Sequence, residues 1–337
     1  MKIDIFIESK VGAERFRDIG LLAEEYGFNC IWVQNYARAP DAFMTAVPLA
    51  LASSRIRVGL CIISPYECHP LKIANSLLTL NEYAGGRASV VISAGGEWPG
   101  VMKKEHGKRI TGARETLEII RGACGDKVLN YDGEVYSSQA FVSPWTTQPA
   151  PRVYMGANGP KTLRMAAGAA DGVMMSDVQP EMFDWGMPAL ESGLADAGRS
   201  IGDGFQFNNF LSWHVKEDAE ASRWEARREL IIRGWLEPKW IDPYLEPEEV
   251  KLVRSKVWNF LTAFRARTGD IEGVPAPIVD ALVEGLTCSG GPEDLDRHIE
   301  RLLEYKAAGF TELSLGLQDD PEDSIRMIGE KVLPALQ

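Results

Sequence analysis

The chain repeats one pattern along its length: a short apolar stretch that suits a strand, followed by an amphipathic stretch that suits a helix. The strand stretches are rich in Ile, Val and Leu, as buried parallel strands are. Eight of them are predicted, at 3–7, 30–34, 56–63, 88–93, 153–157, 173–175, 205–215 and 313–317. Eight strands that alternate with helices indicate an α/β protein with a closed (β/α)8 TIM barrel rather than an open sheet.

Two segments interrupt this pattern. The first, 128–143, has Asp132-Gly133 at a turn and is expected to form a hairpin. The second, 235–277, is a longer insertion rich in Trp, Pro and charged residues. Because α/β barrels reach 337 residues without dividing, we expect one domain, 1–337, that carries both insertions.

The charge and the cysteines restrict the partners and the location. A formal charge of −12 argues against nucleic acid or an anionic membrane as the main partner. No apolar run is long enough for a membrane span, and Asp4 interrupts the first strand, so no signal peptide is expected. Five cysteines without a CxxC pair predict a reduced cytoplasmic protein that has no structural zinc.

The strand at 153–157 is followed by a glycine-containing turn and a helix that is predicted to begin at Pro160. Gly156 and Gly159 are expected to let the backbone turn sharply and to leave no Cβ in the way of a ligand. Such a turn exposes N–H groups at the positive end of a helix dipole, where a phosphate binds well. Similar turns occur throughout βα proteins, so the turn alone favours an ordinary structural turn over a phosphate site.

In an α/β barrel the reacting groups lie at the carboxyl ends of the strands. Acids, amides and glycines dominate these positions in this chain: Glu8, 34–36, 61–64, 94–98, 156–159, 176–177 and 213–214. The sequence has no HExxH motif, no nucleophile elbow, no GxxxxGK[ST] loop and no clear metal triad. A large, flat, anionic cofactor is therefore favoured over a metal or a covalent serine mechanism.

Several motifs together carry a family resemblance. They are the GAxGPK turn at 156–161 with ADG at 170–172, GGRA at 85–88, SPY at 64–66, GPED at 291–294 and the tail 328–336. In this order and spacing the chain resembles the bacterial-luciferase-like superfamily over nearly its whole length, and especially its F420-dependent methylenetetrahydromethanopterin reductases. The resemblance implies a barrel with insertions, usually homodimeric, that binds a deazaflavin or flavin mononucleotide (FMN) and moves a hydride at its central ring.

The resemblance also implies cofactor contacts. The family holds the cofactor ring against a bulge in the third strand that contains a non-prolyl cis peptide, which falls here on Cys61-Ile62. Cys61 could also be an ordinary buried thiol, and that interpretation is compatible with a position beside the cofactor ring. The turn at Asn158 resembles the phosphate and tail site, although Lys161 could equally be a solvated helix residue. The implied cofactor-binding residues are Asn35, Cys61, Ile62, Ser64, Gly95, Gly96, Gly156, Asn158, Gly159, Lys161 and Thr162.

Acid candidates follow from the same resemblance. Gly95-Gly96-Glu97 resembles the end of strand four in F420-dependent sugar-phosphate dehydrogenases, where the Glu exchanges a proton near the reacting carbon. Burial would raise the pKa of such an acid toward neutrality. Glu97 is the first predicted catalytic residue, with a solvated loop carboxylate as the alternative. Glu8 is a second candidate, two positions out of register with the reductases. Ser176 occupies a position that contacts substrate in related enzymes.

One departure from the family bears on the reaction. Many deazaflavin-dependent relatives carry Asp-His after strand two, where this chain has Asn35-Tyr36. Asn35 can form hydrogen bonds but cannot act as a carboxylate. Tyr36 can donate a proton, but with an ordinary pKa near 10 it is a poor base at neutral pH. The departure favours reduction over alcohol oxidation and weakens methylenetetrahydromethanopterin as the expected substrate.

The sequence therefore predicts an oxidoreductase in which reduced coenzyme F420 delivers hydride to an electron-poor C=N, C=C or C=O bond of a small organic substrate. Three alternatives remain open. They are an FMN-dependent luciferase-like monooxygenase, a methylenetetrahydrofolate-type reductase that uses NAD(P)H, and a non-catalytic flavin-binding relative.

Overall fold

The computed structural model describes residues 1–103, 107–125 and 127–336. The described chain forms two compact units. The N-terminal unit comprises Lys2–Met175 and Trp185–Asn208, and the C-terminal unit comprises the remaining described residues. None of the helices in the described part of the chain combines the length and the apolar character needed to span a membrane.

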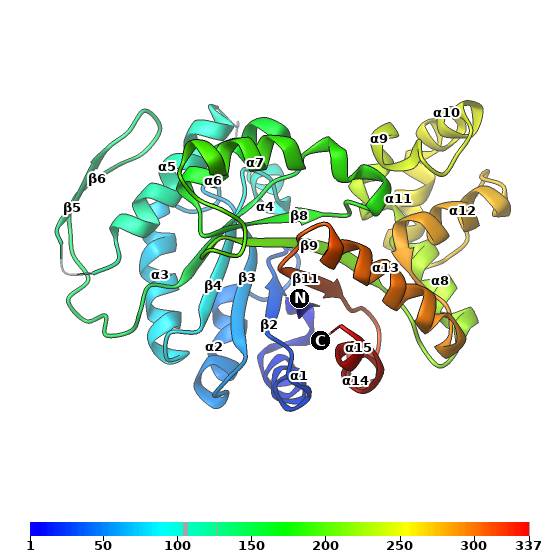
Figure 1. Ribbon diagram of the computed structural model, residues 1–337, viewed down its shortest axis with the longest axis horizontal. Helices are drawn as coiled ribbons and strands as arrows, with labels where there is room; N and C mark the ends of the chain where they lie inside the picture. Colours follow the sequence, from blue (N-terminus) through cyan, green and yellow to red (C-terminus); the bar gives the residue numbers. More distant parts are fainter. Residues whose placement is uncertain (104–106, 126, 337) are drawn as a thin grey trace. The chain divides into compact units, whose positions relative to one another are not determined.

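The N-terminal unit is built on parallel strands that pair in the order β1-β2-β3-β4-β7-β8 (Figure 1). Their bounds are β1 Lys2–Glu8, β2 Cys30–Gln34, β3 Arg57–Ile63, β4 Ala88–Ile92, β7 Arg152–Gly156 and β8 Gly172–Ser176. The helices of this unit are α1 Ala13–Tyr26, α2 Ala42–Ala52, α3 Pro70–Tyr83, α4 Glu97–Val101, α5 Arg109–Gly122, α6 Pro160–Ala169 and α7 Met187–Asp196. Strands and helices alternate along the chain as the sequence predicts.

Local sequence explains where several of these elements begin and end. The Asp41 side chain accepts a hydrogen bond from the backbone N–H of Met44 and so caps the start of α2. Helix α1 ends at Gly27, whose φ of +87° is a left-handed conformation that favours glycine. Every residue of β4 is buried, as expected of a parallel strand covered on both faces.

A buried polar cluster fixes the interior of the N-terminal unit. The Asp4 carboxylate accepts hydrogen bonds from Asn29 Nδ2 at 2.7 Å, Trp32 Nε1 at 2.9 Å and Asn208 Nδ2 at 3.1 Å. The Trp32 ring lies directly against Gly59 of β3, where an added Cβ would come within 2.1 Å of the indole. The strand can pass the ring only because residue 59 has no side chain.

The predicted hairpin is confirmed. Strands β5 Leu129–Asp132 and β6 Ser137–Phe141 pair antiparallel. The Glu115 carboxylate of α5 accepts backbone N–H groups from Glu134, Val135 and Tyr136, at 2.7 to 2.9 Å. One buried carboxylate thus satisfies the tight turn of the hairpin and ties it to α5.

The C-terminal unit contains the end of β9 Gln206–Trp213 together with β10 Thr287–Cys288 and β11 Glu312–Gly316, in the order β10-β9-β11. Its helices are α8 Ala219–Glu229, α9 Pro238–Ile241, α10 Pro247–Ser255, α11 Val257–Ala266, α12 Ala276–Leu286, α13 Leu295–Ala307, α14 Pro321–Met327 and α15 Leu333–Ala335. Single-turn helices occur at Ser9–Val11, Pro180–Trp185, Leu230–Ile232, Gly234–Leu236 and Pro292–Asp294, and a π-helical turn at Ile328–Val332. The 235–277 segment is largely helical, and the two-residue strand β10 was not predicted.

Candidate active site

The carboxyl end of β3 carries an irregular backbone. The Cys61-Ile62 peptide bond is cis, which confirms the position implied by the family resemblance. The pairing of β3 with β4 shifts register between Cys61 and Ile63. A Cβ added at Gly156 of β7 would lie 3.1 Å from Val91 Cγ1 and 3.5 Å from Ile62 Cγ2. The tips of β3, β4 and β7 therefore meet at this bulge.

Cys61 forms part of an apolar wall. Its side chain is buried, and its Sγ lies 3.9 Å from Met174 Sδ of β8. Burial raises the pKa of the Cys61 thiol, so the group is neutral at physiological pH. A neutral thiol can pack against a flat ring but cannot act as a nucleophile.

Asn35, which follows β2, braces the bulge. Its backbone N–H donates to the Cys61 carbonyl at 2.9 Å, and its Nδ2 donates to the Ile62 carbonyl at 3.1 Å. The same Nδ2 donates to Glu67 Oε1 at 2.7 Å, while Trp98 Nε1 donates to Asn35 Oδ1 at 3.2 Å. Both amide hydrogens are thus used within the protein, and Oδ1 alone keeps a further acceptor position.

Glu67 was not predicted from the sequence. It lies half-buried in the loop between β3 and α3. Burial raises the pKa of its carboxyl to about 7, and the charge of Asp41 acts in the same direction, while hydrogen bonds from the Ser64 backbone and Asn35 oppose the rise. The loop that starts at the predicted residues 61–64 was the available signal, because Glu67 is the first acid in it.

Glu97 is the first residue of α4, and its side chain is 37% exposed. Its Oε2 accepts the backbone N–H of Ala37 at 3.0 Å, and Arg38 Nε lies 3.9 Å from its Oε1. The carboxylate therefore ties the loop after β4 to the loop after β2. The burial that the sequence analysis expected for Glu97 is not found, because α4 presents this side chain to solvent.

The other predicted polar residues have different surroundings. Glu8 is buried at the end of β1, pairs in register with Gln34 and forms an ion pair with Lys10. Tyr36 is half-buried in the loop after β2. Ser64 is completely buried, and its Oγ accepts the N–H of Tyr66 at 3.3 Å. The Ser64 hydroxyl therefore fixes the loop that follows β3.

The turn after β7 leads into α6, which begins at Pro160 as predicted. The backbone at Gly159 is extended, with φ of −80°, and Gly156 also lacks a left-handed conformation. The expectation that glycine flexibility forms this turn was therefore wrong: Gly156 is required by close packing instead. A Cβ at Gly159 would meet no atom within 4 Å, so the space beside Asn158 is open. Lys161 is exposed and Thr162 half-buried.

Ser176 lies in the C-terminal unit, at the end of β8. Its Oγ donates to Asp177 Oδ2 at 2.8 Å. Asp177 forms a buried ion pair with Arg233, whose Nη1 lies 2.5 Å from Oδ1, and burial raises the pKa of the Asp177 carboxyl. The serine is therefore tied to a buried charged pair, and its contact with substrate stays a prediction.

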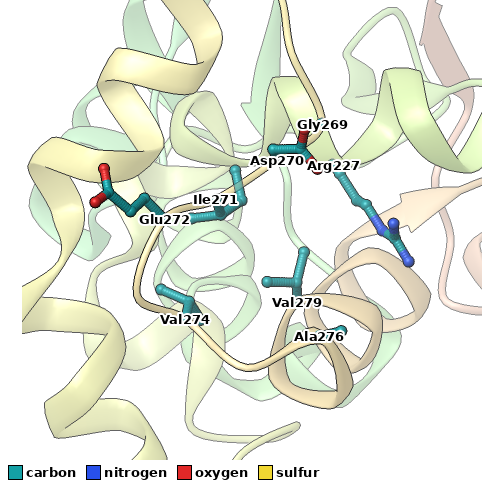
Figure 2. Close-up of a pocket in the computed structure, with 8 residues that line it drawn as sticks. All are labelled: Arg227, Gly269, Asp270, Ile271, Glu272, Val274, Ala276 and Val279. Carbon is teal, nitrogen blue, oxygen red and sulfur yellow. The ribbon is translucent and has the colours of Figure 1, made fainter.

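A surface pocket also occurs within the C-terminal unit, around the loop 269–276 (Figure 2). Apolar side chains such as Ile271, Val274 and Val279 line it. Figure 2 shows the Glu272 carboxylate turned away from the other lining residues, and Arg227 is already paired with Asp280 at 2.5 Å. Because no polar groups converge in it, this pocket is a weaker candidate than the strand tips. Among the described residues, no cluster of His, Cys, Asp and Glu could hold a metal ion.

Residues 1–312 match the family model described as luciferase-like monooxygenase. The chain belongs to the luciferase-like monooxygenase family. The 5,10-methylenetetrahydromethanopterin reductase of Archaeoglobus fulgidus is 31% identical to this luciferase-like chain over 325 residues, which cover 94% of each protein. The F420-dependent glucose-6-phosphate dehydrogenase of Microbacterium testaceum is 26% identical over 349 residues, which cover 97% of this chain and 94% of the relative.

Solved structures agree on the luciferase-like fold. The coenzyme F420-dependent tetrahydromethanopterin reductase from Methanopyrus kandleri matches with a TM-score of 0.84 at 21% identity, covering 100% of this chain and 99% of that one. The predicted (β/α)8 barrel class is confirmed, and so is the resemblance to the F420-dependent branch. The luciferase-like chain is an oxidoreductase.

The open backbone at the strand tips of the N-terminal unit fits a flat cofactor of the luciferase-like kind. Added Cβ atoms at Gly96 and Gly159 would meet nothing within 4 Å, and one at Gly95 would meet only Ser93 Oγ at 3.7 Å. The adjoining wall of Cys61 and Ile62 is apolar, as a ring face requires. The start of α6 offers the Lys161 cation and the Thr162 hydroxyl to an anionic tail, while the N–H groups of Thr162 and Leu163 already donate to the Gly159 carbonyl.

Proposed function

We propose that this chain binds reduced coenzyme F420 and directs its hydride to an electron-poor C=N, C=C or C=O bond of a small organic substrate. The braced bulge at Cys61-Ile62, beside glycines that leave the backbone open, carries the proposal. The names of the relatives support it: one is a methylenetetrahydromethanopterin reductase, another an F420-dependent dehydrogenase.

When bound, the reduced deazaflavin supplies the hydride. Cys61 and Ile62 would support the ring, and Gly95 and Gly96 would leave room beside it, while Gly156 lets the tips of β3, β4 and β7 pack closely. Asn158, Gly159, Lys161 and Thr162 hold the anionic tail at the start of α6, where N–H groups and the helix dipole favour negative charge. Ser64 would fix the loop beside the ring, and Asn35 would offer Oδ1 to it.

Reduction is the proposed direction. Alcohol oxidation needs a base, and the chain has Asn35 where many relatives carry a carboxylate. The Asn35 side-chain N–H groups already bond to Glu67 and the Ile62 carbonyl, so only Oδ1 of this side chain can accept from a ligand. A reduction needs a proton donor instead, for which Glu97, Tyr36 and Glu8 are the candidates from the sequence.

The test is direct binding of the three cofactor types. Equilibrium titrations with F420, FMN and NADPH, followed by fluorescence, should give submicromolar binding of F420 only. Gly159→Leu should weaken F420 binding at least tenfold by filling the open space, whereas Gly168→Leu, at an equally open position within α6, should not. Binding of FMN without F420 would overturn the proposal.

The FMN-dependent monooxygenase is the second candidate, because the matching family model is described as luciferase-like monooxygenase. An oxygen electrode separates the two activities, since a monooxygenase consumes one O2 per turnover and a hydride-transferring reductase consumes none. A protein that binds F420 and reduces no member of an acceptor panel would instead be the non-catalytic relative.

We also propose that the protein is a cytoplasmic homodimer. Helix α2 packs against α1 and α3, yet its Met44 is 72% exposed and its Leu51 is 64% exposed. These residues are seven positions apart and share one face of the helix, which makes an apolar surface that a second copy could cover. All five cysteines are free thiols, which suits a reducing compartment.

A further inference from the structure

The carboxyl group of Glu67 lies beside the β3 bulge, and no sequence motif pointed to it. We propose that Glu67, held there by Asn35, supplies the proton that accompanies hydride transfer. This inference rests on the proposed function and names the proton donor of that same site.

The position of Glu67 is set by hydrogen bonds from the Asn35 side-chain amide and the Ser64 backbone. Asn35 Nδ2 donates both to Glu67 Oε1 at 2.7 Å and to the Ile62 carbonyl at 3.1 Å, so the acid and the bulge share a single anchor. Trp98 Nε1 donates to Asn35 Oδ1 and thereby orients the amide, because an indole N–H can only donate. Because Oε1 accepts from Asn35, we assign the acid proton to Oε2.

The reaction balances with one proton from the protein. Reduction of a C=X bond adds a hydride to carbon and a proton to X. The reduced deazaflavin is the source of the hydride and of both electrons. The proton leaves Glu67 Oε2, the O–H bond breaks as the X–H bond forms, and the carboxylate regains a proton from water. The half-buried position leaves Glu67 accessible to water for this last step.

Glu67 is half-buried, whereas Glu97 is exposed and the buried Glu8 is paired with Lys10. The pKa of the Glu67 carboxyl, raised to about 7, leaves it about half protonated at neutral pH, where a group can both give and regain a proton. Glu97 is exposed and binds the Ala37 N–H and Arg38. The charged and titratable neighbours of Glu67 are Asp41, at the start of α2, and Cys68, with Lys72 of α3 next to that thiol.

The first test needs no cofactor. Carbon-13 NMR of selectively labelled glutamate carboxyls, in the protein without ligands, should show one Glu that titrates near pH 7. The signal should vanish in Glu67→Gln and persist in Glu14→Gln, a matched change at an exposed position on α1. In Asn35→Ala its midpoint should rise, because a hydrogen bond that favours the carboxylate is lost. A Glu67 signal that titrates near pH 4 to 5 would overturn the proposal.

The second test is the pH dependence of turnover with reduced F420. In the wild type, kcat/KM should fall tenfold per pH unit above about 7. Glu67→Gln should lower kcat at least 100-fold, remove this inflection and leave the F420 Kd within threefold, and Glu67→Asp should restore part of the rate. Glu97→Gln should retain the inflection.

The outcomes separate the two proposals. The role of Glu67 would be refuted if Glu97→Gln lost the fall of kcat/KM above about pH 7. It would also be refuted if Glu67→Gln kept that fall and turned over at the wild-type rate. Neither result would contradict the use of F420. A wild type that binds no F420 would refute the proposed function and this role with it, even if the NMR titration places the pKa of Glu67 near 7.

Discussion

Glu24, near the end of α1, should be among the most important single carboxylates for stability. It is 9% exposed and accepts backbone N–H groups from Ser54 at 3.0 Å, Arg55 at 2.7 Å and Ile56 at 2.8 Å, together with the Ser54 hydroxyl. Through these bonds it fixes the chain that enters β3. Burial alone would raise the pKa of Glu24, but the hydrogen bonds outweigh it and lower the pKa from 4.5 to about 2.

The contribution of Glu24 to stability follows from this difference between its ordinary pKa and its pKa in the folded protein. A tenfold change in an acid dissociation constant is worth about 1.4 kcal/mol, so a change from 4.5 to about 2 corresponds to about 3 kcal/mol of stability at pH 7. Because the folded-state pKa is depressed, the contribution is complete above about pH 4.5. It is lost as the pH falls toward 2, and about 2 kcal/mol remains at pH 3.5.

Glu24→Gln tests this reasoning. Urea denaturation at pH 7 should show a loss of about 3 kcal/mol in the free energy of unfolding, and at pH 3.5 a loss of about 2 kcal/mol. The matched control is Glu25→Gln, the exposed neighbour on the same helix turn, which should stay within about 0.5 kcal/mol of the wild type. Equal effects at the two positions, or a loss that does not change with pH, would refute the account.

Two further changes test the packing and the assembly. Gly59→Ala should destabilise the protein by about 3 kcal/mol in the same denaturation assay, because its Cβ would lie 2.1 Å from the Trp32 ring; an unchanged midpoint would contradict this. Met44→Glu combined with Leu51→Glu should convert the proposed dimer to single chains in size-exclusion chromatography with light scattering, without loss of secondary structure. A wild type that already elutes as one chain would contradict the dimer.

The strands of the barrel could be predicted from the sequence because their pattern is local. The predicted 30–34 strand matches β2, and the helix after Gly159 begins at Pro160. Strand β10, Thr287–Cys288, could not be found because two residues show no periodicity. The sequence indicated an insertion at 235–277 but did not locate the bounds of α9, α10 and α11 within it.

The site was predictable only in part. The cis peptide at Cys61-Ile62 came from resemblance to a family, since no local rule in the sequence places it. Glu67 could not be identified from the sequence, because its environment depends on a contact with Asn35, 32 residues earlier in the chain. Glu97 was a candidate because it follows two glycines at a strand end, and its 37% exposure as the first residue of α4 agrees with the alternative of a solvated carboxylate.

The shared anchor at Asn35 limits how this site can be redesigned. Placing Asp at position 35 would bring two carboxyl groups within hydrogen-bonding distance and remove the donor that holds the Ile62 carbonyl. The pKa of Glu67 and the shape of the Cys61-Ile62 wall would then change together. A useful conversion to alcohol oxidation would therefore need a second, compensating substitution at Glu67.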